Sequence, residues 1–145
     1  MSLFQLLSVS ASGMAAQRER AAAIAENLAN AETTRTPEGG PYRRKEVVLS
    51  SAAQMPPFQS VFQDYLGPDV QGVEVSEVRL DDREAEKRYL PGHPDADGEG
   101  YVAFPRVSPA EEMVDLMGTS RNFQANVSAM LAVRDMIHRS LDLLK

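Results

Sequence analysis

The sequence predicts an α+β protein in which two long amphipathic helices, with coiled-coil-like spacing, flank a small β-rich middle domain. At both ends of the chain, apolar residues recur at intervals of three and four, which is the period of a helix. Between the ends the period changes to two, in short β-branched and aromatic runs bounded by glycine and proline. We therefore expect helices within residues 1–35 and 108–145, and a β-rich domain over 36–107.

In the first helix, residues spaced by three and four form a stripe that stays on one side of the helix over about four heptads. Ser2, with Gln5 three residues later, fits a capping box, and the alanine-rich run 21–25 has high helix propensity. Several stripe positions are small or polar, so this helix suits close packing against other helices. The N-terminal stripe consists of Leu3, Leu7, Ser10, Met14, Gln17, Ala21, Ile24, Leu28 and Ala31.

The second helix has the clearest start in the chain. Ser108 fits an N-cap, Pro109 the first helical position, and Glu111 can bond back to the cap. We expect this helix to run nearly to Lys145. Its C-terminal stripe consists of Met113, Leu116, Ser120, Phe123, Val127, Met130, Arg134, Ile137, Leu141 and Leu144, widened by Met117, Leu131, Val133 and Met136.

The middle of the chain has the composition of short strands separated by turns. In the third strand-like run the apolar residues change phase near Ser76 and Glu77, which predicts a β-bulge there. A middle domain of about 75 residues is small for covering two long helices, so we expect partner subunits to cover the rest. The strand-like runs are residues 42–50, 61–65, 70–80 and 101–104, and the turn segments are 36–41, 54–60 and 91–100.

Charge and composition exclude several classes of protein. The net charge of −6 and pI near 4.9 argue against a nucleic-acid binder, which needs a clustered basic surface. Cysteine is absent, so the chain has no disulfide, thiolate metal site or cysteine nucleophile. Residues 1–16 contain no lysine or arginine, unlike a cleavable secretory signal, and no run has membrane-spanning length. We expect a chain that inserts in no membrane and, if exported, keeps its N-terminus.

The sequence offers no convincing catalytic, metal or cofactor site. His93, Asp95, Asp97 and Gly98 resemble the start of a calcium loop, but the first ligand position is a histidine and the twelfth is Phe104. No nucleophile motif and no phosphate-binding glycine loop occur. Acidic and basic residues alternate over 81–88, which is typical of a solvated face. We therefore predict that the chain is not an enzyme and holds no metal or cofactor.

Periodicity alone leaves two interpretations of the long stripes open. Each stripe can face the chain's own core or pack against other chains. The first interpretation gives a soluble α/β binding module with a self-contained core. The second gives a polymerising structural subunit, and the pattern itself favours neither.

Several motifs resemble the flagellar axial protein family, which includes rod and hook subunits. Residues 12–18 (SGMAAQR) and 27–34 (NLANAETT) are similar to the N-terminal signature of that family. Further motifs resemble its proximal rod proteins, although Phe123 stands where tyrosine is common. These motifs are TPEGGPYRRK (36–45), PGHPDADG (91–98), GYV (100–102), EMVD (112–115) and SRNFQANV (120–127).

The resemblance implies a structural subunit of the basal-body proximal rod, the hollow drive shaft of flagellar motility. It implies that both terminal helices pack into the inner layer of the tube. It further implies assembly in the periplasm after delivery by the flagellar type III export apparatus, without signal cleavage. The implied partners are other proximal and distal rod proteins and the adaptor that joins the rod to the membrane ring, in a homo- and hetero-oligomeric assembly.

The resemblance also gives the stripe residues an expected role in contacts between subunits. Apolar members would fill the interface, and polar members would set the register between subunits because buried polar groups need partners. The expected interface residues are Leu3, Leu7, Gly13, Met14, Ile24, Asn27, Leu28, Asn30, Met117, Arg121, Phe123, Gln124, Asn126, Val127, Met130, Ile137 and Leu141.

Overall fold

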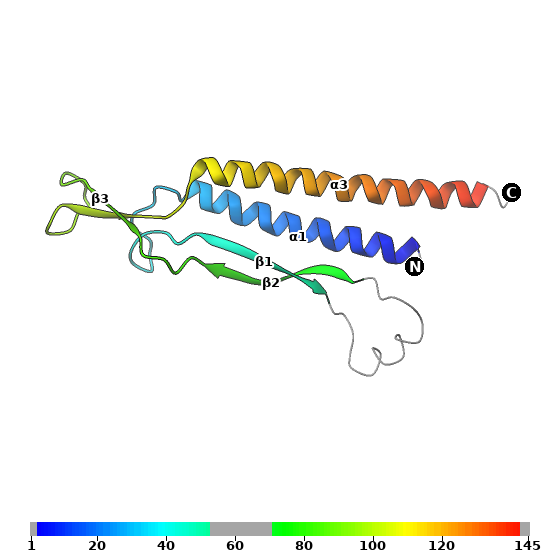
Figure 1. The fold of residues 1–145 in the computed structure, drawn as a ribbon, viewed down its shortest axis with the longest axis horizontal. Helices are drawn as coiled ribbons and strands as arrows, with labels where there is room; N and C mark the ends of the chain where they lie inside the picture. Colours follow the sequence, from blue (N-terminus) through cyan, green and yellow to red (C-terminus); the bar gives the residue numbers. More distant parts are fainter. Residues whose placement is uncertain (1–2, 53–70, 143–145) are drawn as a thin grey trace, which may run out of the picture.

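The computed structural model describes residues 3–52 and 71–142 (Figure 1). Two long helices lie side by side, and two antiparallel hairpins, β1–β2 and β3–β4, occupy the middle of the chain. This confirms the predicted α+β class, whereas the exact subdivision at residues 35 and 107 stays a prediction. The elements are α1 (Leu3–Ala29), β1 (Lys45–Ala52), β2 (Gly72–Leu80), β3 (Glu86–Tyr89), β4 (Tyr101–Phe104) and α3 (Pro109–Asp142).

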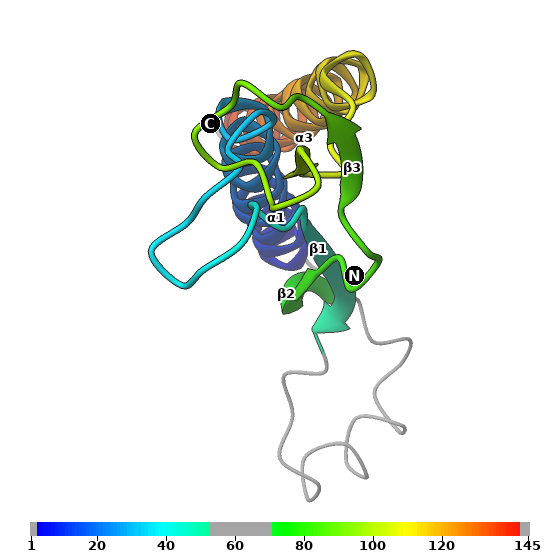
Figure 2. The same ribbon diagram turned by 90° about the vertical axis from the view of Figure 1, so that its left-hand side faces the viewer.

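Helix α1 is covered on two sides, by α3 and by the β1–β2 hairpin (Figures 1 and 2). All described members of the N-terminal stripe from Leu7 onward are buried or half-buried, so this stripe is a packed side of the helix. On the hairpin side, the hydroxyl of Ser12 accepts a hydrogen bond from Val73 N at 3.0 Å. Ala16 and Ala23 share the side of Ser12 by helical spacing and are buried. The predicted cap Ser2 and the side chain of Leu3 lie outside the described residues.

Helix α3 begins where the sequence predicts. Ser108 is the N-cap: its carbonyl accepts a bond from Glu112 N at 3.0 Å, and its hydroxyl accepts a longer one from Glu111 N at 3.5 Å. Pro109 is the first helical residue. The helix continues to Asp142, beyond which residues 143–145 are not described.

The C-terminal stripe, in contrast, coincides only in part with the face that α3 packs within the chain. Its members Leu116, Val127, Met130 and Ile137 are half-buried, whereas others are exposed. Of the residues that α3 buries most, Glu112 and Thr119 lie one position before stripe residues, whereas Val133 belongs to the widened stripe. Polar side chains occupy the start of the packing face, so a search for apolar residues selects the adjacent positions, such as Met113, instead. The described stripe residues that are exposed are Met113, Met117, Ser120, Phe123, Leu131, Arg134, Met136 and Leu141.

The β1–β2 hairpin contains the predicted bulge. Val48 pairs with Glu77 and Leu49 pairs with Val75, so Ser76 is the extra residue on β2. The Ser76 hydroxyl donates to Val48 O at 3.1 Å, which fixes the bulged residue to the partner strand. The predicted strand-like run 61–65 lies outside the described residues.

The β3–β4 hairpin contains a strand that the sequence interpretation missed. Residues 86–89 were expected to form only a solvated charged face, yet they pair with 101–104 from Glu86↔Phe104 to Tyr89↔Tyr101. All four β3 residues are exposed, so the strand has no buried face and no period of two. Pairing with β4, rather than burial of its own side chains, defines β3.

Two glycines in the helices test how closely α1 and α3 approach. A Cβ at Gly13 would lie 3.1 Å from Asn126 Nδ2 of α3, whereas a Cβ at Gly118 would meet no atom within 4 Å. We expect Gly118→Ala to stabilise the chain by about 0.5–1 kcal/mol through helix propensity. Gly13→Leu should destabilise it by about 1–3 kcal/mol by forcing the helices apart. Urea denaturation measures both, and stabilisation by both substitutions would contradict the close approach at Gly13.

Candidate assembly interface

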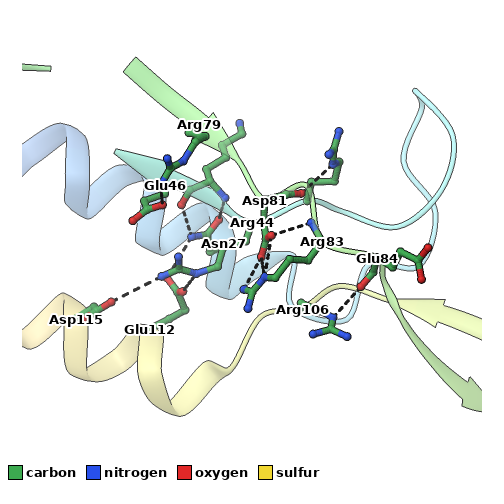
Figure 3. Close-up of polar contacts among 12 residues, drawn as sticks. Asn27, Arg44, Glu46, Arg79, Asp81, Arg83, Glu84, Arg106, Glu112 and Asp115 are labelled. Carbon is green, nitrogen blue, oxygen red and sulfur yellow. Dashed lines mark hydrogen bonds and ion pairs between the residues drawn. The ribbon is translucent and has the colours of Figure 1, made fainter. Parts of the chain in front are cut away.

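A buried polar junction joins α1, the start of β1 and the first turn of α3 (Figure 3). At its centre, the Asn27 side chain of α1 is fully buried. Its Oδ1 accepts bonds from Tyr42 Oη at 3.0 Å and from Lys45 N at 2.8 Å. Its Nδ2 donates to Lys45 O at 2.9 Å and to Glu112 Oε2 at 3.2 Å. The amide therefore uses both donors and both acceptor positions inside the chain.

The carboxylate of Glu112 is 1% exposed and is neutralised by Arg44. Arg44 Nε donates to Glu112 Oε1 at 2.6 Å, and its guanidinium also lies 3.8 Å from Asp115 of α3. Burial lowers the pKa of Arg44, but the hydrogen bond and attraction of Glu112 outweigh burial and raise that pKa. A buried carboxylate is tolerated here because it has both a cation and an amide as partners.

More ion pairs extend from the junction toward solvent (Figure 3). Arg79 pairs with Glu46 across the β1–β2 hairpin at 2.7 Å, and Arg83 pairs with Asp81 at 2.6 Å. Hydrogen bonds from Arg83 lower the pKa of Asp81 to about 2. Because their arginines are largely exposed, these outer pairs contribute little to stability compared with the buried junction.

Tyr42 connects the junction to the loop after α1. Its hydroxyl donates to Asn27, and its backbone N donates to Thr33 O at 3.0 Å. Burial, followed by the negative charges of Glu26 and Glu112, raises the pKa of Tyr42 to about 12. Tyr42 is therefore the neutral hydroxyl partner of the buried amide.

The sequence interpretation missed most of this junction. It named Asn27, but as a contact to other subunits, and it gave no role to Tyr42, Arg44 or Glu112. One signal was present in the sequence: Glu112, Thr119, Asn126 and Val133 are spaced by seven and so share one face of the helix. That spacing was overlooked because three of the four side chains are polar.

The side of α3 that faces away from α1 carries large apolar side chains without cover. We call the exposed Met113, Val114, Met117, Leu131 and Met136 the outer face of α3. By helical spacing they are turned away from the buried Glu112, Thr119 and Val133, over a broad arc of the helix. Val114 is 67% exposed and Met117 is 59% exposed. Such an apolar surface on one helix is typical of an interaction site.

The structure divides the expected interface residues into three groups. Ile24 and Asn27 are buried within the chain. The exposed group is Met117, Arg121, Phe123, Gln124 and Leu141. The half-buried group is Leu7, Gly13, Met14, Leu28, Asn30, Asn126, Val127, Met130 and Ile137. Their contacts with other subunits stay a prediction, and the exposed residues are the ones that can meet another chain without rearrangement.

The acidic turn before β4 makes hydrogen bonds within itself and to the loop after α1. His93 Nδ1 accepts a bond from Asp95 N at 3.1 Å, and Asp95 Oδ2 accepts one from the Thr34 hydroxyl at 2.8 Å. Asp97 Oδ1 accepts bonds from the backbone of Glu99 and Tyr101. These bonds hold the turn in shape. Within residues 3–52 and 71–142, no helix is long and apolar enough to cross a membrane.

Comparison with known proteins identifies similar sequences over the whole chain. Residues 7–35 match the family model "Flagella basal body rod protein", and residues 99–143 match "Flagellar basal body rod FlgEFG protein C-terminal". The flagellar basal-body rod protein FlgC of Bacillus subtilis is 41% identical over 99% of both chains. FlgC of Borreliella burgdorferi is 37% identical over 100% of this chain and 99% of its own. FlgC of Salmonella typhimurium is 37% identical over 99% of this chain and 98% of its own.

The raised pKa of Tyr42 predicts how stability depends on alkaline pH. In the unfolded chain Tyr42 ionises near 10.0, whereas the folded chain keeps the proton until about 12. Its contribution is therefore complete below pH 10 and is lost as the pH rises from 10 to 12. We expect the stability of Tyr42→Phe, measured by urea denaturation, to fall less steeply than that of the unmodified chain over this range. If stability falls equally steeply with pH in both proteins, the junction does not raise the pKa of Tyr42.

Proposed function

This chain belongs to the FlgC family of flagellar basal-body rod proteins, and we propose that, as a structural subunit of the rod, it packs against its neighbours through the outer face of α3. The observation that carries the proposal is that α3 is covered on one side and exposes large apolar residues elsewhere. One side of α3 packs against α1, and the rest of its surface exposes Met113, Val114, Met117, Leu131 and Met136. A polymer supplies the cover that the single chain lacks.

Energetics support this assignment. Burying one side chain of this size contributes about 1.5–3 kcal/mol, so a few outer-face residues covered by a neighbouring helix can drive association. Arg121 and Gln124 lie among them and are exposed. Because a buried polar group needs a hydrogen-bond partner, these two residues would fix the register between neighbouring helices.

The partners and location follow from the family. We infer that the neighbours are other proximal and distal rod proteins and the adaptor to the membrane ring. We further infer that the chain reaches the periplasm through the flagellar type III export apparatus without signal cleavage. The relatives compared above are named as flagellar basal-body rod proteins, so we infer a structural rather than catalytic role. A self-contained binding module is not favoured, because the similarity to rod proteins spans the whole chain.

Two positions on α3 separate assembly from folding. Leu131 is 45% exposed on the outer face, whereas Val133 is 6% exposed against the rest of the chain. We expect Leu131→Asp to destabilise the isolated chain by no more than about 1 kcal/mol, because an exposed site tolerates a charge and the main cost is helix propensity. The same variant should fail to enter purified basal bodies and should abolish motility. Val133→Asp should destabilise the isolated chain by more than about 3 kcal/mol.

The matched pair makes the proposal falsifiable. Circular dichroism and urea denaturation measure folding, and immunoblots of purified basal bodies measure incorporation. Normal incorporation of Leu131→Asp would show that this part of the outer face is not covered in the rod. Basal bodies that lack the unmodified chain would contradict its assignment as a rod subunit.

A further inference from the structure

A second uncovered apolar surface lies at the tip of the β3–β4 hairpin. We call Tyr89, Leu90 and Tyr101 the hairpin tip; they are 63%, 43% and 40% exposed. The hairpin extends past the end of the molecule where α3 begins (Figure 1). Neither β3 nor β4 packs against α3 in the same chain. The tip is thus remote from the packed helices.

The hairpin tip is held in one shape by its own contacts. Leu90 N donates to Gly100 O at 2.9 Å, and Tyr101 N donates to Asp97 Oδ1 at 2.8 Å. The rings of Tyr89 and Tyr101 meet edge to face with centroids 5.3 Å apart. Gly100 has a φ of +85°, and a Cβ there would lie 3.0 Å from the Tyr89 ring. A rigid pair of exposed tyrosines beside a leucine loses little conformational entropy on binding, as interface anchors require.

The outer face of α3 provides a surface of matching chemistry. Its first two turns expose Met113, Val114 and Met117, and methionine sulfur makes favourable contacts with aromatic rings. The tip of the same chain does not contact this surface, because the hairpin extends away from α3 (Figure 1). Only another chain can bring the two surfaces together.

One pair of charges beside the two surfaces is complementary. Glu99 lies in the turn next to Tyr101, and Arg121 lies one helical turn after Met117 on the outer face. Both side chains are exposed, and in the part of the chain that the structure describes neither forms an ion pair. Contact between the surfaces would place a carboxylate near a guanidinium.

We propose that the hairpin tip of one copy of this chain packs on Met113, Val114 and Met117 of a second copy, with Glu99 of the first copy pairing with Arg121 of the second. The two surfaces differ, so the contact is heterologous: each copy uses its tip on one neighbour and its α3 on the other. Repetition of such a contact generates a ring or a helical turn rather than a closed dimer. The proposal rests on the proposed function, because it places copies of this chain side by side in the rod.

Cysteine cross-linking tests the contact directly, because the chain contains no cysteine of its own. Cells that carry the full-length double variant Leu90→Cys with Met117→Cys are oxidised, and basal bodies are analysed by non-reducing electrophoresis. We expect disulfide-linked dimers and higher oligomers of this chain. The matched control, Leu90→Cys with Met136→Cys, places the second thiol far along the same outer face and should give none.

Charge reversal tests the same contact in the working flagellum. Glu99→Arg and Arg121→Glu should each reduce swimming on soft agar, because each places like charges against each other. The double variant should restore most of the loss, since it re-forms the pair with opposite polarity. As a matched control, Glu74→Arg changes an exposed glutamate on β2 and should have no effect that Arg121→Glu rescues.

The combined results separate this inference from the proposed function. The tip contact is overturned if the chain enters basal bodies but no cross-link forms between positions 90 and 117. It is also overturned if this cross-link is no stronger than that of the Met136 control. Either result leaves the rod assignment intact. The tip contact is likewise overturned if the double charge-reversal variant swims no better than the two single variants. Absence of the unmodified chain from basal bodies would instead contradict the proposed function.

Discussion

The buried amide of Asn27 is the interaction on which the rest of the structure depends. An amide enclosed in protein must find all its hydrogen-bond partners there, and Asn27 finds them on three separate segments: Tyr42, Lys45 and Glu112. These partners lie in the loop after α1, at the first residue of β1 and in the first turn of α3. Satisfying one side chain therefore fixes the positions of both helices and the hairpin relative to each other. The Ser108 cap contributes because it sets where Glu112 falls on α3.

In this arrangement the two helices differ in how much of their surface the chain itself covers. Helix α1 lies between α3 and the β1–β2 hairpin, with small residues such as Ala16 and Gly13 at its contacts, so the single chain covers much of its surface. Helix α3 is covered on one side only and keeps methionine, valine and leucine exposed on the other. The helix that completes the core of the monomer is thus also the helix that offers a surface to other subunits. A rigid polar junction at its first turn holds that surface in a defined orientation.

Local signals predicted most of the described elements, but polar side chains concealed the packing face of α3. Ser108 and Pro109 predicted the start of α3, and the change of phase at Ser76 predicted the bulge, because caps and bulges depend on a few neighbouring residues. The packing face of α3 was misjudged because Glu112 and Thr119 are buried through hydrogen bonds made with distant segments or with the backbone, which hydrophobicity does not reveal. Strand β3 was missed because only its pairing with β4 defines it. The motifs of the chain were nevertheless sufficient to recognise its family.

A double-mutant cycle between Asn27 and Glu112 tests the central role of the junction most directly. Asn27→Ala, Glu112→Ala and the double variant are compared with the unmodified chain by urea denaturation of the isolated protein. The two side chains share a hydrogen bond of 3.2 Å and the same buried surroundings. Once either is removed, the other loses a buried hydrogen-bond partner, so the double variant should cost less than the sum of the single variants by about 1 kcal/mol or more. Additive effects would contradict the account, because they would show that α1 and α3 are stabilised independently of this contact.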